Sequence, residues 1–162
     1  MKIPAIAFII IGSNKRNMRL TICSSLDFVK EMKDVSEKLK DLGHHVLLPM
    51  TAELVIKGEL TQEQIKKEKE SGDIVNRSIK HNAIKTHFEK IKNSEGILVL
   101  NLEKKGIKNY IGGAVFMEMG FAYGIDKKIF LLNAIPEVPY REEILMMQPA
   151  VLYGDLTKLE SL

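Results

Sequence analysis

The chain has 162 residues, of which 45% are hydrophobic and 28% charged, and this is enough for one globular domain with a substantial core. Its formal net charge of +3, from 24 basic and 21 acidic residues, is too small to indicate a nucleic-acid-binding protein. The single cysteine, Cys23, excludes an internal disulfide and favours a reducing cytoplasm.

The first residues include an apolar run, residues 3–11, which is preceded by Lys2 and weakly resembles the core of a signal peptide. No small-x-small cleavage site follows, and the run is too short to span a bilayer, so we expect no membrane association. Met18 directly precedes a better strand pattern. We therefore predict a single α/β domain over residues 18–162. Residues 1–17 would be an N-terminal extension, as an extra strand, a tail or an over-called translation start.

The opening of the domain predicts a β-α-β unit. Residues 20–24 form a short apolar strand, and the hydroxyl groups of Ser24 and Ser25 can cap the helix that follows. That helix ends at Gly43, and residues 46–48 form a second strand. Two strands joined by a helix in this way nearly always make a right-handed parallel crossover. The apolar stripe of the helix consists of Phe28, Val29, Met32, Val35, Leu39 and Leu42.

The middle of the chain is polar before it becomes apolar again. Residues 51–76 are rich in charges, which is most simply a solvated helical face, and we interpret them as a charged helical insertion or lid. An apolar stripe at helical spacing then runs from Ile79 to Ile91 and leads into a strongly apolar strand at residues 96–100. His87 borders that stripe rather than the outer face of the helix.

Residues 109–124 predict a loop followed by a helix. Gly112 and Gly113 permit a close backbone approach, and the N–H groups of the first helical turn are unpaired donors. Glu118 is an ionisable group among apolar neighbours in this helix. A solvated position is the plain explanation for one such carboxylate, and a functional site is the alternative.

The last part of the chain predicts two more strands, at residues 128–132 and 151–153, with a short helical turn at residues 142–147 between them. The order of elements is therefore β-α-β, charged insertion, α-β-α-β, and a last strand. This order indicates a doubly wound parallel α/β sheet.

Open parallel sheets bind ligands across the carboxyl ends of their strands, where the strand-to-helix loops meet. Two loops qualify, Ser24–Ser25 and Gly112–Gly113, since both can present backbone N–H groups and the serines add hydroxyl groups. Helix capping alone would also explain the serines. The chain lacks a Walker loop, a dinucleotide fingerprint and a Cys/His metal spacing, so we expect no cofactor and no metal.

Three stretches carry a resemblance to a known family: CSSLDF after the first strand, SEGILVLN at the central strand, and GGAVFMEMGFAYGIDKKIFLL. Together they resemble the nucleoside 2-deoxyribosyltransferase superfamily, which includes the deoxynucleoside 5'-monophosphate N-glycosidases, over residues 20–156. The resemblance implies a flavodoxin-like or Rossmann-like fold, a nucleoside or nucleotide substrate and a homo-oligomer. It also implies that Glu118 is the catalytic nucleophile.

The chain departs from the family pattern at two places. His87 stands where the family usually has an aspartate that helps to protonate the departing base or to position the sugar, and a histidine can do either. The phosphate-binding serine of the monophosphate glycosidases is also missing from the glycine-rich turn, although Ser24 and Ser25 could serve a phosphate.

The leading hypothesis is an enzyme that cleaves or transfers the N-glycosidic bond of a nucleoside or nucleotide, with Glu118 and His87 as catalytic residues. The alternatives are a non-catalytic nucleotide-binding or sensing module of the same fold, and an oligomer-building protein with a vestigial pocket. Further candidates for contact with a base or sugar are Phe28, Asn101, Asn109 and Tyr110.

Overall fold

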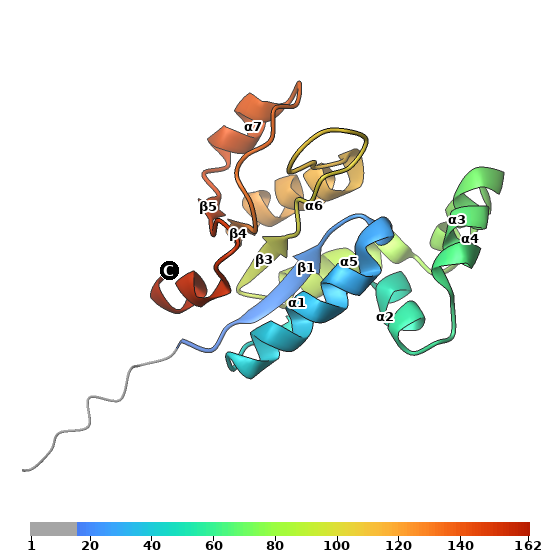
Figure 1. Ribbon diagram of the computed structural model, residues 1–162, viewed down its shortest axis with the longest axis horizontal. Helices are drawn as coiled ribbons and strands as arrows, with labels where there is room; N and C mark the ends of the chain where they lie inside the picture. The colour runs from blue at the N-terminus through green and yellow to red at the C-terminus, as the bar shows by residue number, and fades with distance from the viewer. Residues whose placement is uncertain (1–15) are drawn as a thin grey trace, which may run out of the picture.

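The structure is a computed structural model that describes residues 16–162, and it contains one five-stranded sheet (Figure 1). The strand order is β2-β1-β3-β4-β5, and every pair of neighbouring strands is parallel. This confirms the predicted doubly wound, flavodoxin-like or Rossmann-like sheet. The strands are β1 Arg19–Cys23, β2 His45–Leu47, β3 Gly96–Val99, β4 Lys128–Leu131 and β5 Ala150–Val151.

The three central strands are buried on both faces, which explains their nearly continuous apolar sequences. Side chains alternate between the faces, so Leu20 and Ile22 belong to one core cluster while Cys23 belongs to the other. The ends of the strands lie level, because Cys23 pairs with Val99 and Val99 pairs with Leu131. The loops after these strands therefore meet at one edge of the sheet.

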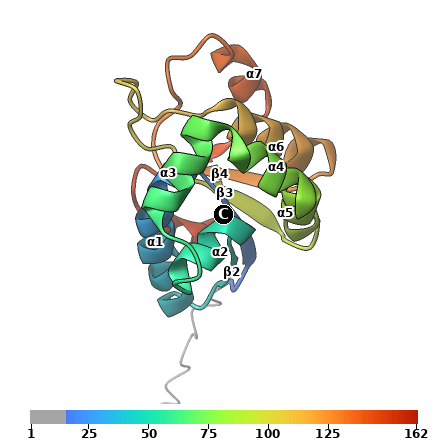
Figure 2. The same ribbon diagram turned by 90° about the vertical axis from the view of Figure 1, so that its right-hand side faces the viewer.

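Helices cover both faces of the sheet (Figures 1 and 2). On one face the core cluster includes residues of α1, Val29–Asp41, and of the C-terminal 3-10 helix η2, Leu156–Ser161. On the other face it includes residues of α5, Ala83–Lys92, α6, Gly113–Gly124, and α7, Arg141–Met146. Cys23 points into the layer formed by α5 and α6.

The predicted charged insertion consists of three helices: α2 Met50–Ile56, α3 Gln62–Ser71 and α4 Asp73–Lys80. Helices α3 and α4 project from one side of the molecule, and the view in Figure 2 looks onto them. The Nε2 atom of Gln62 donates a hydrogen bond of 3.2 Å to the carbonyl of Leu26, in the loop region after β1. The start of α3 therefore lies beside the loop at the carboxyl edge of the sheet, whereas α2 is not fully solvated as predicted, because its Ala52 is buried in the core cluster.

The prediction of one helix from Ile79 to Ile91 is wrong, because the structure divides this stretch between two helices. Helix α4 ends at Lys80 and α5 begins at Ala83, and between them Asn82 has a left-handed φ of 48° that no helix continues through. Ile79 remains 70% exposed for this reason and is not part of the core.

The structure differs from one further prediction, at the C-terminal end of the sheet. The last strand is β5, Ala150–Val151, rather than residues 151–153, because Tyr153 has a left-handed φ of 53° and turns the chain away. The predicted N-terminal extension, residues 1–17, lies outside the described residues except for residues 16 and 17. Within residues 16–162, no helix combines the length and the apolar character needed to cross a membrane.

Candidate active site

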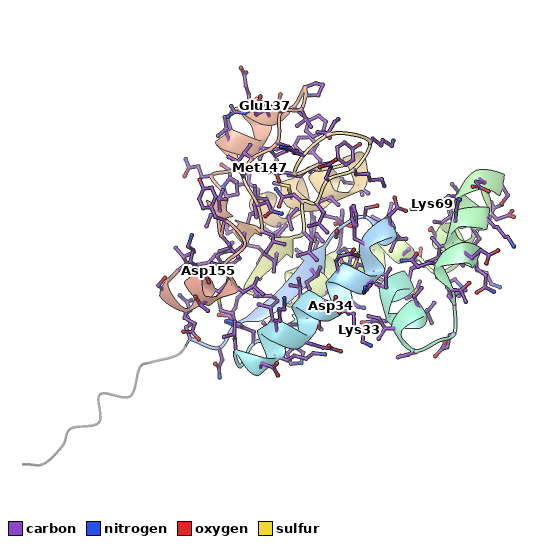
Figure 3. The ribbon with its side chains drawn as sticks, viewed as in Figure 1. Lys33, Asp34, Lys69, Glu137, Met147 and Asp155 are labelled. Carbon is purple, nitrogen blue, oxygen red and sulfur yellow. The ribbon has the colours of Figure 1, made fainter. Side chains whose placement is uncertain are left out.

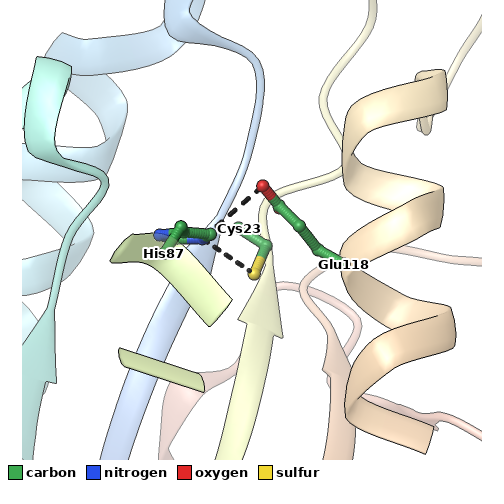
Figure 4. A group of neighbouring side chains, drawn as sticks. All are labelled: Cys23, His87 and Glu118. Carbon is green, nitrogen blue, oxygen red and sulfur yellow. Dashed lines mark hydrogen bonds and ion pairs between the residues drawn. The ribbon is translucent and has the colours of Figure 1, made fainter. Parts of the chain in front are cut away.

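Three chemically different side chains meet at the carboxyl edge of the sheet, and we call them the Cys23–His87–Glu118 cluster (Figure 4). Cys23 is the last residue of β1, His87 lies in the middle of α5, and Glu118 lies in the middle of α6. The Nε2 atom of His87 is 3.6 Å from Oε1 of Glu118 and 3.5 Å from Sγ of Cys23. The structure thus brings together the two residues that the sequence predicted as catalytic.

Helix α6 places Glu118 on its inner face by simple periodicity. Val115 and Ala122 lie three residues before and four residues after Glu118, and both are buried against the sheet. Glu118 therefore lies on the inner face of α6 together with the apolar residues, and its side chain is only 16% exposed. A solvated surface glutamate, the plain explanation, does not describe this position.

Helix α5 turns His87 inward in the same way, since His87 and Ile91 are one turn apart and both are buried. The two helices are locked side by side by a stacked pair of rings. The centroids of Phe88 and Phe121 are 4.1 Å apart with an interplanar angle of 6°. Phe88 is adjacent to His87 and Phe121 is one turn from Glu118, so the stack packs α5 against α6 close to the two polar side chains.

Burial dominates the electrostatics of the cluster. It raises the pKa of Glu118 to about 7, against a smaller lowering by the hydrogen bond from Cys23. It lowers the pKa of His87 to about 4, and the positive charge of Lys90 adds to the effect. Burial, followed by the negative charge of Glu118, also raises the pKa of the Cys23 thiol well above its usual value. Near neutral pH the histidine and the thiol are uncharged, while Glu118 is partly ionised.

Two polar atoms of the cluster are buried and have no hydrogen-bond partner among the described residues. They are Nδ1 of His87 and Oε2 of Glu118. Buried polar groups are normally paired, because leaving one unpaired costs about 1–3 kcal/mol. The cluster therefore has free capacity to bind a ligand group.

The two serines of the first loop have different structural partners. The hydroxyl of Ser24 donates to the carbonyl of Leu100 at 2.9 Å, which ties the loop after β1 to the end of β3. The hydroxyl of Ser25 caps the short 3-10 helix Leu26–Phe28 by accepting from the backbone N–H of Asp27. Ser25 also accepts a hydrogen bond of 2.7 Å from Nζ of Lys104. The predicted capping role is confirmed for Ser25.

A charged group beside Ser25 was not predicted from the sequence. Asp27 forms ion pairs with Lys104 and with Lys69 of α3, and Figure 3 shows the position of Lys69 on this projecting helix. Partial burial alone would raise the pKa of Asp27, but hydrogen bonds from Lys104 and Lys69 outweigh it and lower the pKa to about 2. The insertion is thereby anchored to both loops at the carboxyl edge.

The remaining predicted contact residues do not all face the cluster. Asn101 is fully buried, and its amide bonds the backbone of Asn133 and Ala134, so it joins the ends of β3 and β4. Tyr110 packs against Gly112, where a Cβ atom would lie 3.2 Å from its ring. A Cβ at Gly113 would meet nothing within 4 Å, so there is open space above the first turn of α6. Asn109 has a left-handed φ of 56°.

Phe28, the last of these predicted residues, is half-buried at the end of the short 3-10 helix. Cys23 is the one cluster member that the sequence analysis did not assign to the site. Its position directly before Ser24, at the end of a strand, was the available signal. A surface depression of about 390 Å³ lies at the opposite, amino-terminal edge of the sheet, beside Arg19, His45 and Glu95. The candidate site is the Cys23–His87–Glu118 cluster rather than this depression, because three side chains with different chemistry converge at the cluster.

Comparison of the chain with models of protein families, with curated proteins and with solved structures finds no match.

Proposed function

We propose that the protein cleaves or transfers the N-glycosidic bond of a nucleoside or nucleotide, with Glu118 as the nucleophile. The observation that carries this proposal is the pairing of a buried glutamate with a histidine at 3.6 Å on the carboxyl edge of a parallel sheet. The motif around Glu118, GGAVFMEMGFAYG, supports it through its resemblance to the nucleoside 2-deoxyribosyltransferase superfamily. Open space at Gly113 would leave room for a substrate at the start of α6.

The proposed reaction proceeds in two displacements. In the first, the bond between C1' of the sugar and the base nitrogen breaks, its electron pair leaves with the base, and a Glu118 oxygen bonds to C1'. In the second, water attacks C1', the ester electron pair returns to Glu118, and the proton released by water passes to the departed base. A second base in place of water would give transfer instead of hydrolysis.

The assigned role of His87 is to position Glu118 and the sugar. Its pKa of about 4 leaves the imidazole neutral near pH 7, so it holds no extra proton to donate to the base. A neutral imidazole can instead donate or accept one hydrogen bond at Nε2, the atom that faces Glu118. Of the two roles that the sequence left open, this environment favours the hydrogen-bonding one.

The first loop supports testing nucleotides as well as nucleosides. Ser25 offers a hydroxyl and Lys104 an ammonium group at the same edge of the sheet, and both suit a phosphate oxygen. The carboxylate of Asp27 forms an ion pair with Lys104, so a phosphate would have to compete with that carboxylate for the ammonium group.

The direct test is a search for free base. Wild-type protein is incubated with a panel of ribonucleosides, deoxynucleosides and their 5'-monophosphates, and the products are separated by liquid chromatography. We expect base release from at least one substrate, its loss in E118Q and its retention in E142Q, which changes an exposed glutamate in α7. Release at the wild-type rate by E118Q would exclude Glu118 as the nucleophile.

A second candidate function is a nucleotide-binding or sensing module without turnover. The neutral state of His87 favours it, because no charged acid stands beside Glu118 to assist departure of the base. This candidate predicts that a nucleoside or nucleotide raises the thermal unfolding temperature while no free base forms. Base release in the same incubation would exclude it.

A further inference from the structure

The Cys23–His87–Glu118 cluster combines a thiol sulfur, an imidazole nitrogen and a carboxylate oxygen. One ligand atom from each side chain lies within 4.8 Å of the others, and Figure 4 shows the three side chains pointing toward one another. Cys23 and His87 are 64 positions apart in the chain, so no short sequence motif contains both of them. The expectation of no metal site was drawn from local spacing alone.

Two of the three ligand-atom distances within the cluster are close to those around a tetrahedral zinc ion. Zinc lies about 2.3 Å from thiolate sulfur and about 2.0–2.2 Å from imidazole nitrogen or carboxylate oxygen. A tetrahedral angle then places sulfur about 3.5 Å from nitrogen, and nitrogen about 3.3 Å from oxygen. The corresponding distances are 3.5 Å between Sγ of Cys23 and Nε2 of His87, and 3.6 Å between Nε2 and Oε1 of Glu118.

The same atoms are poorly satisfied by each other. The 3.5 Å between Sγ of Cys23 and Nε2 of His87 is a weak sulfur hydrogen bond, and the 3.6 Å between Nε2 and Oε1 of Glu118 is beyond the usual limit for a nitrogen-to-oxygen hydrogen bond. The second carboxylate oxygen of Glu118 is buried without a partner among the described residues. His87 is only 6% exposed, and a cation between these groups would supply the partner that their burial calls for.

We propose that Cys23, His87 and Glu118 form a zinc-binding site. The ligand set suits a borderline-soft ion, since thiolate and imidazole disfavour magnesium and calcium. Three protein ligands leave a fourth position for water or an added ligand.

This site and the proposed nucleophile exclude each other. A Glu118 oxygen bound to zinc cannot also attack the sugar, so zinc-loaded protein would be inactive in glycosidic cleavage. The zinc site does not depend on that function, because it rests only on the placement of three side chains and would also serve a non-catalytic protein.

The test uses metal alone, without substrate. Full-length protein is freed of metal with a chelator, and Zn²⁺ binding is measured by calorimetry while Co²⁺ binding is followed by its thiolate charge-transfer absorption. We expect one ion per chain, a dissociation constant for zinc below about 1 μM, and a sulfur-to-cobalt band. C23S should remove the band, and both C23S and E118Q should weaken zinc binding by at least about tenfold.

The control is H81A, which removes an exposed histidine outside the cluster and should bind zinc as the wild type does. Circular dichroism checks that each variant is folded, and E118Q keeps the test valid if C23S does not fold. The proposal is overturned if the wild type binds no stoichiometric zinc, if the cobalt band persists in C23S, or if H81A loses binding as the cluster variants do.

Discussion

Replacing Glu118 with glutamine should stabilise the protein at pH 8 and have little effect on stability at pH 5. The reason is that burial raises the pKa of this carboxyl from 4.5 to about 7. A carboxyl whose pKa is higher in the folded state binds its proton more tightly there. The contribution of Glu118 to the free energy of unfolding is therefore most favourable below pH 4.5. It falls as the pH rises toward 7 and stays low above pH 7.

The magnitude follows from the two pKa values. Each unit corresponds to about 1.4 kcal/mol, so ionising Glu118 in the folded protein costs about 3 kcal/mol at pH 8 and less than about 1 kcal/mol at pH 5. Glutamine has nearly the same shape and carries no charge. The stability difference between E118Q and wild type should therefore increase by about 2.5 kcal/mol between pH 5 and pH 8.

The assay is urea unfolding of both proteins at the two pH values, with a chelator present so that no metal occupies the cluster. Groups that titrate alike in both proteins cancel in the double difference, and E142Q at an exposed position should show no such difference. An unchanged gap between E118Q and wild type at pH 5 and pH 8 would refute the burial of an ionisable carboxyl at this place.

Other predictions concern activity, packing and assembly. Base release should rise with pH through about 7 and then level off, since the nucleophile must be ionised; a rate that falls over this range would contradict that role. H87D, which places a second carboxylate beside Glu118, should shift this rise to higher pH, and an unshifted profile would show that the two side chains do not interact. F121A, which removes the ring stacked on Phe88, should lower the free energy of unfolding by about 2 kcal/mol and reduce activity, while unchanged stability in urea would count against the locking of α5 to α6. The predicted homo-oligomer should sediment as more than one chain, and M146E at a 63% exposed residue of α7 should dissociate it if this helix is the interface.

The fold was predictable because the central strands and α6 have strong apolar patterns of the right length. The pattern failed between Ile79 and Ile84, where apolar residues keep helical spacing across a break that the backbone of Asn82 makes. Periodicity reports which positions could share a face, and it does not report whether the chain stays helical between them.

The site was predictable in part for a similar reason. Glu118 and His87 each border an apolar helical stripe, and topology then brings their helices together. Cys23 and Lys104 were missed because their importance comes from neighbours distant in the chain: His87 and Glu118 for the thiol, and Ser25 and Asp27 for the lysine. Such contacts have no signature in local sequence.

The covalent intermediate tests the central claim most directly. Wild-type protein and E118Q are mixed with a substrate that releases base, quenched in acid during turnover, digested and analysed by mass spectrometry. The proposed mechanism predicts a sugar attached to Glu118 in the wild type and no sugar on the corresponding peptide of E118Q. A sugar found on another residue, or base release by E118Q at the wild-type rate, would contradict it.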